Sequence, residues 1–215
     1  MIKGAIFDAD GTLLNSMHIW SELGERYLKS LSIEPEKGLS DRLYPLSINQ
    51  GCKYLKDNYG LNFSLKEIEQ GLLSIIEGFY RNEVKLKPGV KNFLESMKQK
   101  NIPMVIATSG DRDLLNSALI RNGISGYFDA VFTCSELETS KHEAKIFMAC
   151  SEALGLNPEN IAVFDDALYA LETAKNAGFI TFGVEDPSAK LNKNEIKRIS
   201  DYYITDFTLQ EVYKL

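Results

Sequence analysis

The fold is decided near the start of the chain by an apolar run that ends in Asp8-Ala9-Asp10-Gly11-Thr12-Leu13-Leu14. The run extends from Ile2 to Phe7 and has the length of a buried strand, and the Asp and Gly residues that follow it are typical of a turn. Two carboxylates are therefore expected just beyond the end of a buried strand. Open α/β sheets bind ligands beyond the carboxyl ends of their strands.

Similar apolar runs predict the remaining strands at residues 104–108, 130–133, 161–164, 180–184 and, with a weaker pattern, 202–205. Segments with helical periodicity separate most of these runs from residue 88 onward. An alternation of strands and helices predicts a doubly wound, mostly parallel sheet with helices on both faces. The fold class expected for this part of the chain is therefore α/β.

The segment between the first two strands has helical periodicity and no convincing strand pattern. Its first helix is expected to bury the face formed by Trp20, Leu23, Tyr27, Leu28 and Leu31, and two more helices are expected around residues 54–55 and 68–79. The sequence thus predicts an α/β core of residues 1–15 and 87–215 and an inserted all-helical cap of residues 16–86. Arg42, Tyr44 and Ser47 are expected in the loop between the first two cap helices.

The composition is that of an ordinary globular protein, with a hydrophobic fraction of 44%, a charged fraction of 25% and a formal net charge of -6. An acidic chain argues mildly against a nucleic acid partner, because phosphate backbones select basic surfaces. Small phosphorylated substrates need only a local positive site. Three cysteines fit a reduced, cytoplasmic setting, and the absence of an apolar stretch of membrane-spanning length predicts no membrane span.

Polar groups follow four of the predicted strands and together suggest a chemical function. They are the pair Asp8 and Asp10, the segment Thr108-Ser109-Gly110, the single residue Lys141, and the pair Asp165 and Asp166. Each has an ordinary alternative explanation as a turn, a helix cap or a solvated lysine. Because the carboxyl ends of parallel strands meet at one edge of a sheet, these groups could gather in one site. There they would supply a nucleophile, an acid, a phosphate anchor, a cation and a metal ligand, which is a complete set for phosphoryl transfer.

These motifs resemble those of the haloacid dehalogenase superfamily, in the branch with a helical cap after the first motif, which includes β-phosphoglucomutase-like phosphatases. The resemblance covers essentially the whole chain. Residues 7–13 resemble the first motif and residues 107–110 the second, while Lys141 matches the third and residues 163–166 the fourth. Two positions depart from the common pattern: His142 follows Lys141 where relatives often have Pro, and Asp165 stands where they often have Glu.

The resemblance implies a phosphohydrolase that acts through an aspartyl-phosphate on Asp8, with Asp10 as general acid and base. It implies that Mg²⁺ is held by Asp8, by the backbone carbonyl of Asp10 and by Asp166, with Asp165 nearby in a supporting position. Thr108 and Lys141 would stabilise the transferred phosphoryl group. Ser109 and Gly110 would join them in binding the substrate, a small phosphorylated metabolite such as a sugar phosphate. The protein is expected to be a monomer or a weak homodimer.

Three alternatives remain open at this point. A phosphomutase would use the same residues and transfer the phosphoryl group to a sugar hydroxyl. A regulatory protein could sense a phosphorylated ligand without turnover, although the intact set of charged residues argues against it. A dehalogenase is disfavoured by Asp10 and the metal ligand. Arg42 is the one cation in residues 41–47, and it is the candidate ligand for the second phosphate of a mutase intermediate.

Overall fold

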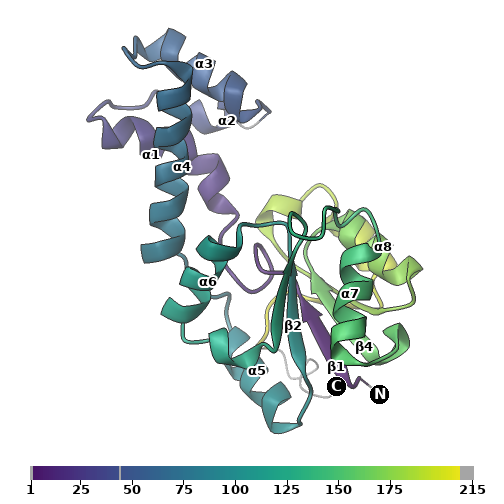
Figure 1. The fold of residues 1–215 in the computed structure, drawn as a ribbon. Coiled ribbons are helices and arrows are strands. Elements are labelled where there is room, and N and C mark those ends of the chain that lie inside the picture. Colours follow the sequence, from purple (N-terminus) through teal and green to yellow (C-terminus); the bar gives the residue numbers. More distant parts are fainter. Residues whose placement is uncertain (1, 44, 209–215) are drawn as a thin grey trace. The chain divides into compact units, whose positions relative to one another are not determined.

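The computed structural model describes residues 2–43 and 45–208, and the chain divides into two compact units (Figure 1). The core unit consists of Met1–Ser16 and Val84–Leu215, and the cap unit consists of Met17–Glu83. The sequence pattern placed the two junctions after residues 15 and 86. The chain therefore leaves the core after its first strand and returns before its second.

The core unit contains a six-stranded parallel sheet in the order β3-β2-β1-β4-β5-β6. Its strands are β1 (Gly4–Phe7), β2 (Met104–Thr108), β3 (Ala130–Thr133), β4 (Ile161–Asp165), β5 (Ile180–Val184) and β6 (Tyr202–Ile204). Short 3₁₀ turns at Ser125–Tyr127, Pro158–Asn160 and Pro187–Ala189 join some of the elements. The predicted α/β fold class is confirmed.

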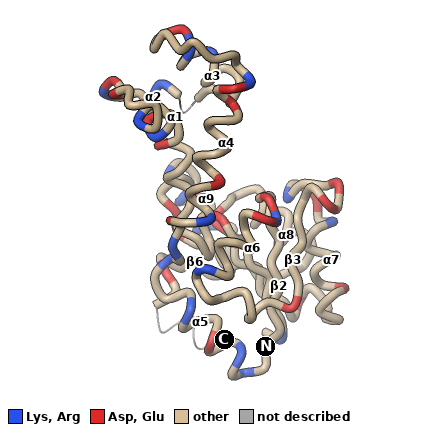
Figure 2. Tube along the Cα trace, turned by 60° about the vertical axis from the view of Figure 1, so that its left-hand side comes forward, with Lys and Arg blue, Asp and Glu red and all other residues tan. Residues whose placement is uncertain are grey.

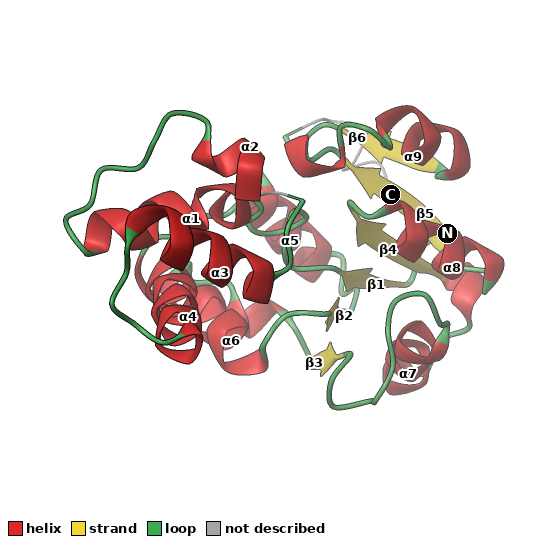
Figure 3. Cartoon of the chain, turned by 90° about the horizontal axis from the view of Figure 1, so that it is seen from above, coloured by secondary structure: helices red, strands yellow, loops and turns green. Residues whose placement is uncertain are grey.

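Helices cover both faces of this sheet (Figure 3). One face carries α5 (Val90–Gln99) and α6 (Arg112–Arg121), and the other carries α7 (Lys145–Leu154), α8 (Leu168–Asn176) and α9 (Lys193–Ile199). The chain adds β2 and β3 on one side of β1, and it adds β4, β5 and β6 on the other side. The direction in which the sheet grows therefore changes between β1 and β4. Ligand sites of open α/β sheets lie at such a point, beyond the carboxyl ends of the strands.

Stacked aromatic side chains fix the centre of the sheet. The ring of Phe7 on β1 stacks on Phe164 of β4 with centroids 4.7 Å apart, and Phe164 stacks on Phe182 of β5 at 4.5 Å. All three side chains are buried. Each buried phenylalanine contributes about 2–3 kcal/mol from the removal of its apolar surface from water. This packing holds β1 and β4 in register, and the residues that follow both strands carry the site described below.

The cap unit is helical, as the periodicity predicted, with α1 (His18–Ser30), α2 (Leu39–Leu43), α3 (Ile48–Tyr59) and α4 (Leu65–Asn82). Capping boxes begin the last two helices. Ser47 and Gln50 exchange side-chain and backbone hydrogen bonds at the start of α3, and Ser64 and Glu67 do the same for α4. These bonds satisfy amide groups that a helix N-terminus otherwise leaves unpaired.

Two expectations for the cap were wrong. Trp20 does not belong to the buried face of α1: its side chain is 46% exposed, and Ile19 is buried in its place. Arg42 lies in the short helix α2, not in a loop. For Trp20, the packing of α1 against α2 and α4 decides which positions of the helix are covered. Tyr44 lies outside the described residues.

Charged residues of both signs are interspersed along the helices of each unit (Figure 2). Within the cap unit, for example, Arg26 bonds to both Glu22 and Glu83. Among the described residues, no helix has both the length and the apolar character needed to cross a membrane.

Candidate active site

Three buried aspartates meet at the carboxyl end of the central strands. Asp8 directly follows β1, Asp165 is the last residue of β4, and Asp166 follows it. One carboxylate oxygen from each lies within 4.8 Å of the other two. The parallel pairing of β1 with β4 brings them together, since it aligns Phe7 with Phe164 and so brings the residues after them to the same edge.

Lys141 places a buried ammonium group among these aspartates. It lies in the loop between β3 and α7, and its side chain is 3% exposed. The Nζ atom bonds to Asp8 Oδ1 and donates to Asp165 Oδ2 at 2.8 Å. Burial disfavours the charged lysine, but the charges of Asp165 and Asp8 outweigh it and raise the pKa of Lys141. Lys141 is therefore a fixed cation beside Asp8.

The site is too acidic for one lysine to neutralise. Burial raises the pKa of Asp8 well above its ordinary value, Lys141 opposes this, and Asp165, Asp166 and Asp10 add to it. Burial, followed by the charges of Asp165 and Asp186, raises the pKa of Asp166 to about 7. The site therefore holds more negative charge than Lys141 can neutralise, and a divalent cation bound there would neutralise the rest.

The donor set fits a hard cation. Mg²⁺ prefers oxygen ligands and commonly takes one or two carboxylates, with water and phosphate completing its shell. Asp8 and Asp166 are the better placed of the three aspartates, because both carboxylate oxygens of Asp165 are already engaged. Its Oδ2 accepts from Lys141, and its Oδ1 accepts from the backbone N–H of Ala167 at 2.9 Å. Asp166 is oriented by Thr12, whose hydroxyl donates to it at 3.3 Å.

Asp10 lies outside this three-aspartate cluster. Its Oδ1 accepts a hydrogen bond of 2.6 Å from Ser16, a fully buried residue at the end of the core segment. Its Oδ2 lies close to the backbone of Gly110, where an added Cβ would approach it to 3.0 Å. Asp10 is therefore positioned between the turn after β1 and the turn after β2.

The second motif forms a compact turn at the end of β2. Thr108 is buried, and its hydroxyl accepts a hydrogen bond of 2.9 Å from the backbone N–H of Gly110. Ser109 is exposed, and its Oγ lies 3.5 Å from the sulfur of Cys134. Asp111 caps α6 immediately afterwards by accepting from two backbone N–H groups. A polar turn that leads into a helix N-terminus is suited to binding a phosphate group.

The sequence patterns did not identify several supporting residues. Ser16 has no motif spacing that singles it out. Thr12 lies within the first motif, but its position there does not reveal its contact with Asp166. Lys87 and Asp186 form a buried ion pair of 2.8 Å, and their charges act on Asp166. Burial of a lone lysine or aspartate has no sequence signal, because the same residues are usually solvated.

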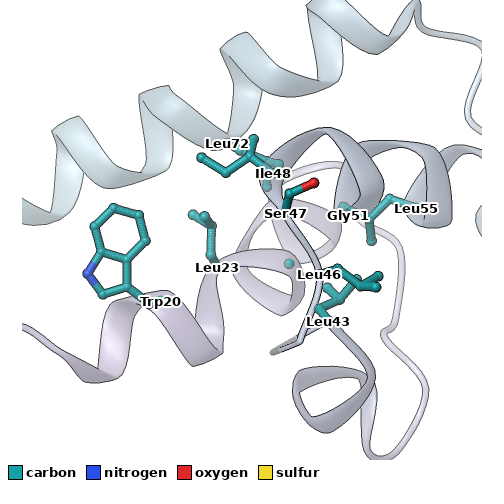
Figure 4. Close-up of a pocket in the computed structure, with 10 residues that line it drawn as sticks. Trp20, Leu23, Leu43, Leu46, Ser47, Ile48, Gly51, Leu55 and Leu72 are labelled. Carbon is teal, nitrogen blue, oxygen red and sulfur yellow. The ribbon is translucent and has the colours of Figure 1, made fainter. Parts of the chain in front are cut away.

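The cap unit contains a separate apolar cavity of about 220 Å³ (Figure 4). Its lining consists of Trp20, Leu23, Gly24, Leu43, Leu46, Ser47, Ile48, Gly51, Leu55 and Leu72. Arg42 is outside this lining. Its guanidinium bonds to Glu36 at 2.5 Å and to the Tyr54 hydroxyl at 3.3 Å, so the candidate phosphate ligand is paired within the cap.

Four features together define a class of phosphoryl-transfer enzymes. They are a doubly wound parallel sheet, a buried aspartate after its central strand, a lysine beside that aspartate and an inserted helical unit. The comparisons with known proteins agree. The family model of haloacid dehalogenase-like hydrolases matches residues 5–184, and the chain belongs to this family. The predicted resemblance is confirmed.

Individual relatives are distant but similar over most of their length. A phosphorylated carbohydrates phosphatase of Thermotoga maritima is 26% identical over 177 residues, which is 82% of each chain. Hexitol phosphatase B of Escherichia coli is 22% identical over 192 residues, covering 88% of this chain and 86% of that enzyme. The crystal structure of a candidate β-phosphoglucomutase from Thermotoga maritima has a TM-score of 0.85 at 25% identity and covers 99% of both chains.

Proposed function

We propose that this chain is a cytoplasmic phosphatase that hydrolyses a phosphate monoester of a small metabolite, with a phosphorylated sugar or polyol as the substrate class. The observation that carries the proposal is the contact of Lys141 with Asp8 inside a cluster of three buried aspartates. The relatives that act on phosphorylated carbohydrates and hexitols support the substrate class.

Asp8 is the nucleophile in this proposal. One of its carboxylate oxygens attacks phosphorus, the bond from phosphorus to the leaving oxygen breaks, and an aspartyl-phosphate forms. Lys141 contacts Asp8 directly, so it holds a positive charge where the phosphoryl oxygens accumulate negative charge. The Thr108 turn binds the same oxygens. Mg²⁺, held by Asp8 and Asp166, would neutralise the charge of the phosphate and of the anionic nucleophile.

Asp10 moves the protons. Its carboxyl group donates a proton to the leaving oxygen in the first step and accepts one from the attacking water in the second, which releases inorganic phosphate and restores Asp8. Its contact with Ser16 and its proximity to Gly110 fix the carboxyl group between two turns of the core. A carboxylate held in this way can serve both steps without leaving its position.

Transfer to a sugar hydroxyl, as in a phosphomutase, is the second candidate, and the similarity to a candidate β-phosphoglucomutase favours it. The pairing of Arg42 with Glu36 and Tyr54 argues against it. A mutase must hold the second phosphate of a bisphosphate intermediate, and a cation already engaged by a carboxylate is a poor ligand for that phosphate. Water is therefore the expected acceptor.

The test supplies a hexose 1-phosphate with Mg²⁺ and a trace of the matching 1,6-bisphosphate, and follows inorganic phosphate and hexose 6-phosphate together. We expect phosphate release as the main reaction, and we expect Arg42→Ala to leave its rate unchanged. Rapid isomerisation with little phosphate release, lost in Arg42→Ala, would establish the mutase instead. A panel of other sugar and polyol phosphates then ranks the substrates.

A further inference from the structure

Two aromatic rings stack on the core unit next to the candidate active site. His142 directly follows Lys141 in the loop between β3 and α7, and Tyr169 is the second residue of α8. Their ring centroids are 4.3 Å apart, and their planes are inclined by only 18°. His142 is exposed and Tyr169 is 40% exposed, so the stack lies at the surface. The proposed mechanism assigns neither ring a role.

The stack lies beside an internal ion pair that joins the same loop to the end of β4, directly before α8. Lys141 in the loop donates to Asp165, and Asp165 accepts from the backbone N–H of Ala167 just before α8. The loop is thus connected to the β4–α8 segment twice, by the buried contact of Lys141 with Asp165 and by the surface contact of His142 with Tyr169. The charged residues of the site also act on the phenol group of Tyr169. Burial raises the pKa of its phenol, and the charge of Asp165 raises it further.

Several hydrogen bonds within residues 139–143 shape the loop locally. The backbone N–H of His142 donates to Ser140 Oγ at 3.3 Å, and that of Glu143 donates to the Ser140 carbonyl at 3.0 Å. Thr139 Oγ1 donates to Glu143 at 3.0 Å. These bonds join neighbouring residues to one another. They curve the chain around Lys141, but they do not set its distance from Asp165.

We propose that the His142–Tyr169 stack is a positioning device that holds Lys141 between Asp8 and Asp165, a role that rests on the proposed phosphatase function. A lysine side chain has several rotatable bonds, so the place of its ammonium group depends on the backbone that carries it. Stacked rings have a preferred distance and orientation. By fixing the residue next to Lys141 against α8, the stack keeps the ammonium group in the site while Asp8 changes from carboxylate to acyl phosphate.

The test separates stacking from other properties of the two side chains. His142→Ala and Tyr169→Ala should each lower kcat about three- to tenfold, the effect expected from the loss of one aromatic pair. His142→Phe and Tyr169→Phe keep a ring and should stay within about twofold of the wild type. The double alanine variant should be no slower than either single variant, since both remove the same contact.

A matched control is available in the same unit. Phe182 and Tyr202 also stack, with centroids 4.6 Å apart and planes inclined by 12°, and Tyr202 is 52% exposed. Tyr202→Ala removes a stack of similar geometry between β5 and β6. It should lower the melting temperature at least as much as Tyr169→Ala and leave kcat unchanged.

A second measurement does not depend on turnover. Orthovanadate mimics a transferred phosphoryl group, and calorimetric titration of each variant in the presence of Mg²⁺ measures how well Lys141 is placed to receive one. We expect the alanine variants to bind vanadate more weakly and the phenylalanine variants to bind it normally. Normal kcat and vanadate affinity in the alanine variants would overturn the proposal, and so would phenylalanine variants as slow as the alanine variants. Failure of the phosphatase function itself would instead appear as a wild type that binds vanadate but hydrolyses no monoester.

Discussion

At the scale of single residues, the site depends on how much negative charge is concentrated around Asp8. Burial and three neighbouring aspartates raise the pKa of Asp8, while Lys141 lowers it. A carboxyl group must be ionised to attack phosphorus. Lys141 and a divalent cation favour the ionised form of Asp8 near neutral pH. The same charges that disfavour an ionised Asp8 in the metal-free protein create a binding site for the metal.

Asp8→Asn should abolish turnover and leave the fold intact. The change is nearly isosteric but removes the anionic nucleophile, so we expect kcat to fall by roughly 10³-fold or more. Phosphate release measures the rate, and the circular dichroism spectrum and melting temperature check the fold. Asp129→Asn, a change at an exposed aspartate of the same unit, is the control and should have no effect. A folded Asp8→Asn protein with normal turnover would disprove the mechanism.

Mg²⁺ binding should weaken as the pH falls below about 7. The pKa of Asp166 is raised to about 7 without metal, so below that pH the ion must displace a proton from this carboxyl group. The apparent dissociation constant should then rise by up to about tenfold per pH unit. Calorimetric titrations at pH 6, 7 and 8 measure this dependence. Equal affinity at all three pH values would contradict the assignment of Asp166.

The raised pKa of Asp166 also predicts how Mg²⁺ affects the stability of the fold. Because the folded pKa of Asp166 lies above the unfolded value of 3.8, its contribution to stability is lost as the pH rises through about 7 in the metal-free protein. Mg²⁺ should therefore raise the melting temperature more at pH 8 than at pH 5.5. In Asp166→Asn that difference should largely disappear, whereas in Asp129→Asn it should remain.

At the scale of elements, the turn after β1 matters most, because it supplies Asp8 and Asp10 and also packs against Asp166. Gly11 makes this turn possible. Its φ of +81° is one that residues with a side chain rarely adopt, and a Cβ at this position would overlap the Asp166 carboxylate. The glycine therefore serves both the backbone conformation and the close approach of a candidate metal ligand.

Gly11→Ala should damage the site beyond the cost of backbone strain. Strain alone costs about 1–2 kcal/mol, and displacement of Asp166 should in addition weaken Mg²⁺ binding by roughly tenfold or more. Gly38→Ala is the matched control, because Gly38 has φ +82° and an added Cβ there meets no heavy atom of the described residues within 4 Å. Thermal unfolding and Mg²⁺ titration of both variants test this. Similar Mg²⁺ affinities in the two would contradict the role given to Gly11.

At the scale of the whole molecule, the chain passes between the two units at two junctions, and hydrogen bonds join the two connecting segments on the core side. Leu14 and Leu86 form an isolated antiparallel bridge, and Asn15 N–H donates to the Lys85 carbonyl at 2.9 Å. Lys87, where the chain re-enters the core, is buried and pairs with Asp186 at 2.8 Å. Its ammonium also donates to the Glu185 carbonyl at 2.7 Å. These contacts fix both connecting segments to the core sheet.

Lys87→Met should destabilise the core unit by about 3 kcal/mol, since it leaves the buried charge of Asp186 without its partner. Combining it with Asp186→Leu removes both charges and should recover a large part of this loss. Urea unfolding of the wild type, the single variant and the double variant provides the measurement. If the single variant is as stable as the wild type, the ion pair does not anchor the returning segment.

Local physics allowed the sequence to predict most of the fold. Apolar runs of strand length, the helical periodicity of the insert and the Asp8 to Leu14 turn each depend on residues close together in the chain. The parallel sheet followed from the alternation of strands and helices. The same reasoning placed Asp8, Thr108, Lys141 and Asp165 at strand ends or in the loops beyond them, and so predicted that they belong to one site.

The contacts of these residues, by contrast, depend on the tertiary structure. Lys141 and Asp8 are 133 positions apart, and no local pattern specifies that an ammonium group bonds to that carboxylate. Ser16, Lys87 and the His142–Tyr169 stack depend in the same way on segments that meet only in the folded sheet. Trp20 differed from expectation because the covered face of α1 is set by the helices that pack against it, and Arg42 differed because residues 39–43 form a short helix and not a loop. Sequence periodicity fixes which residues can share a face, whereas packing decides which face is buried and which charges become partners.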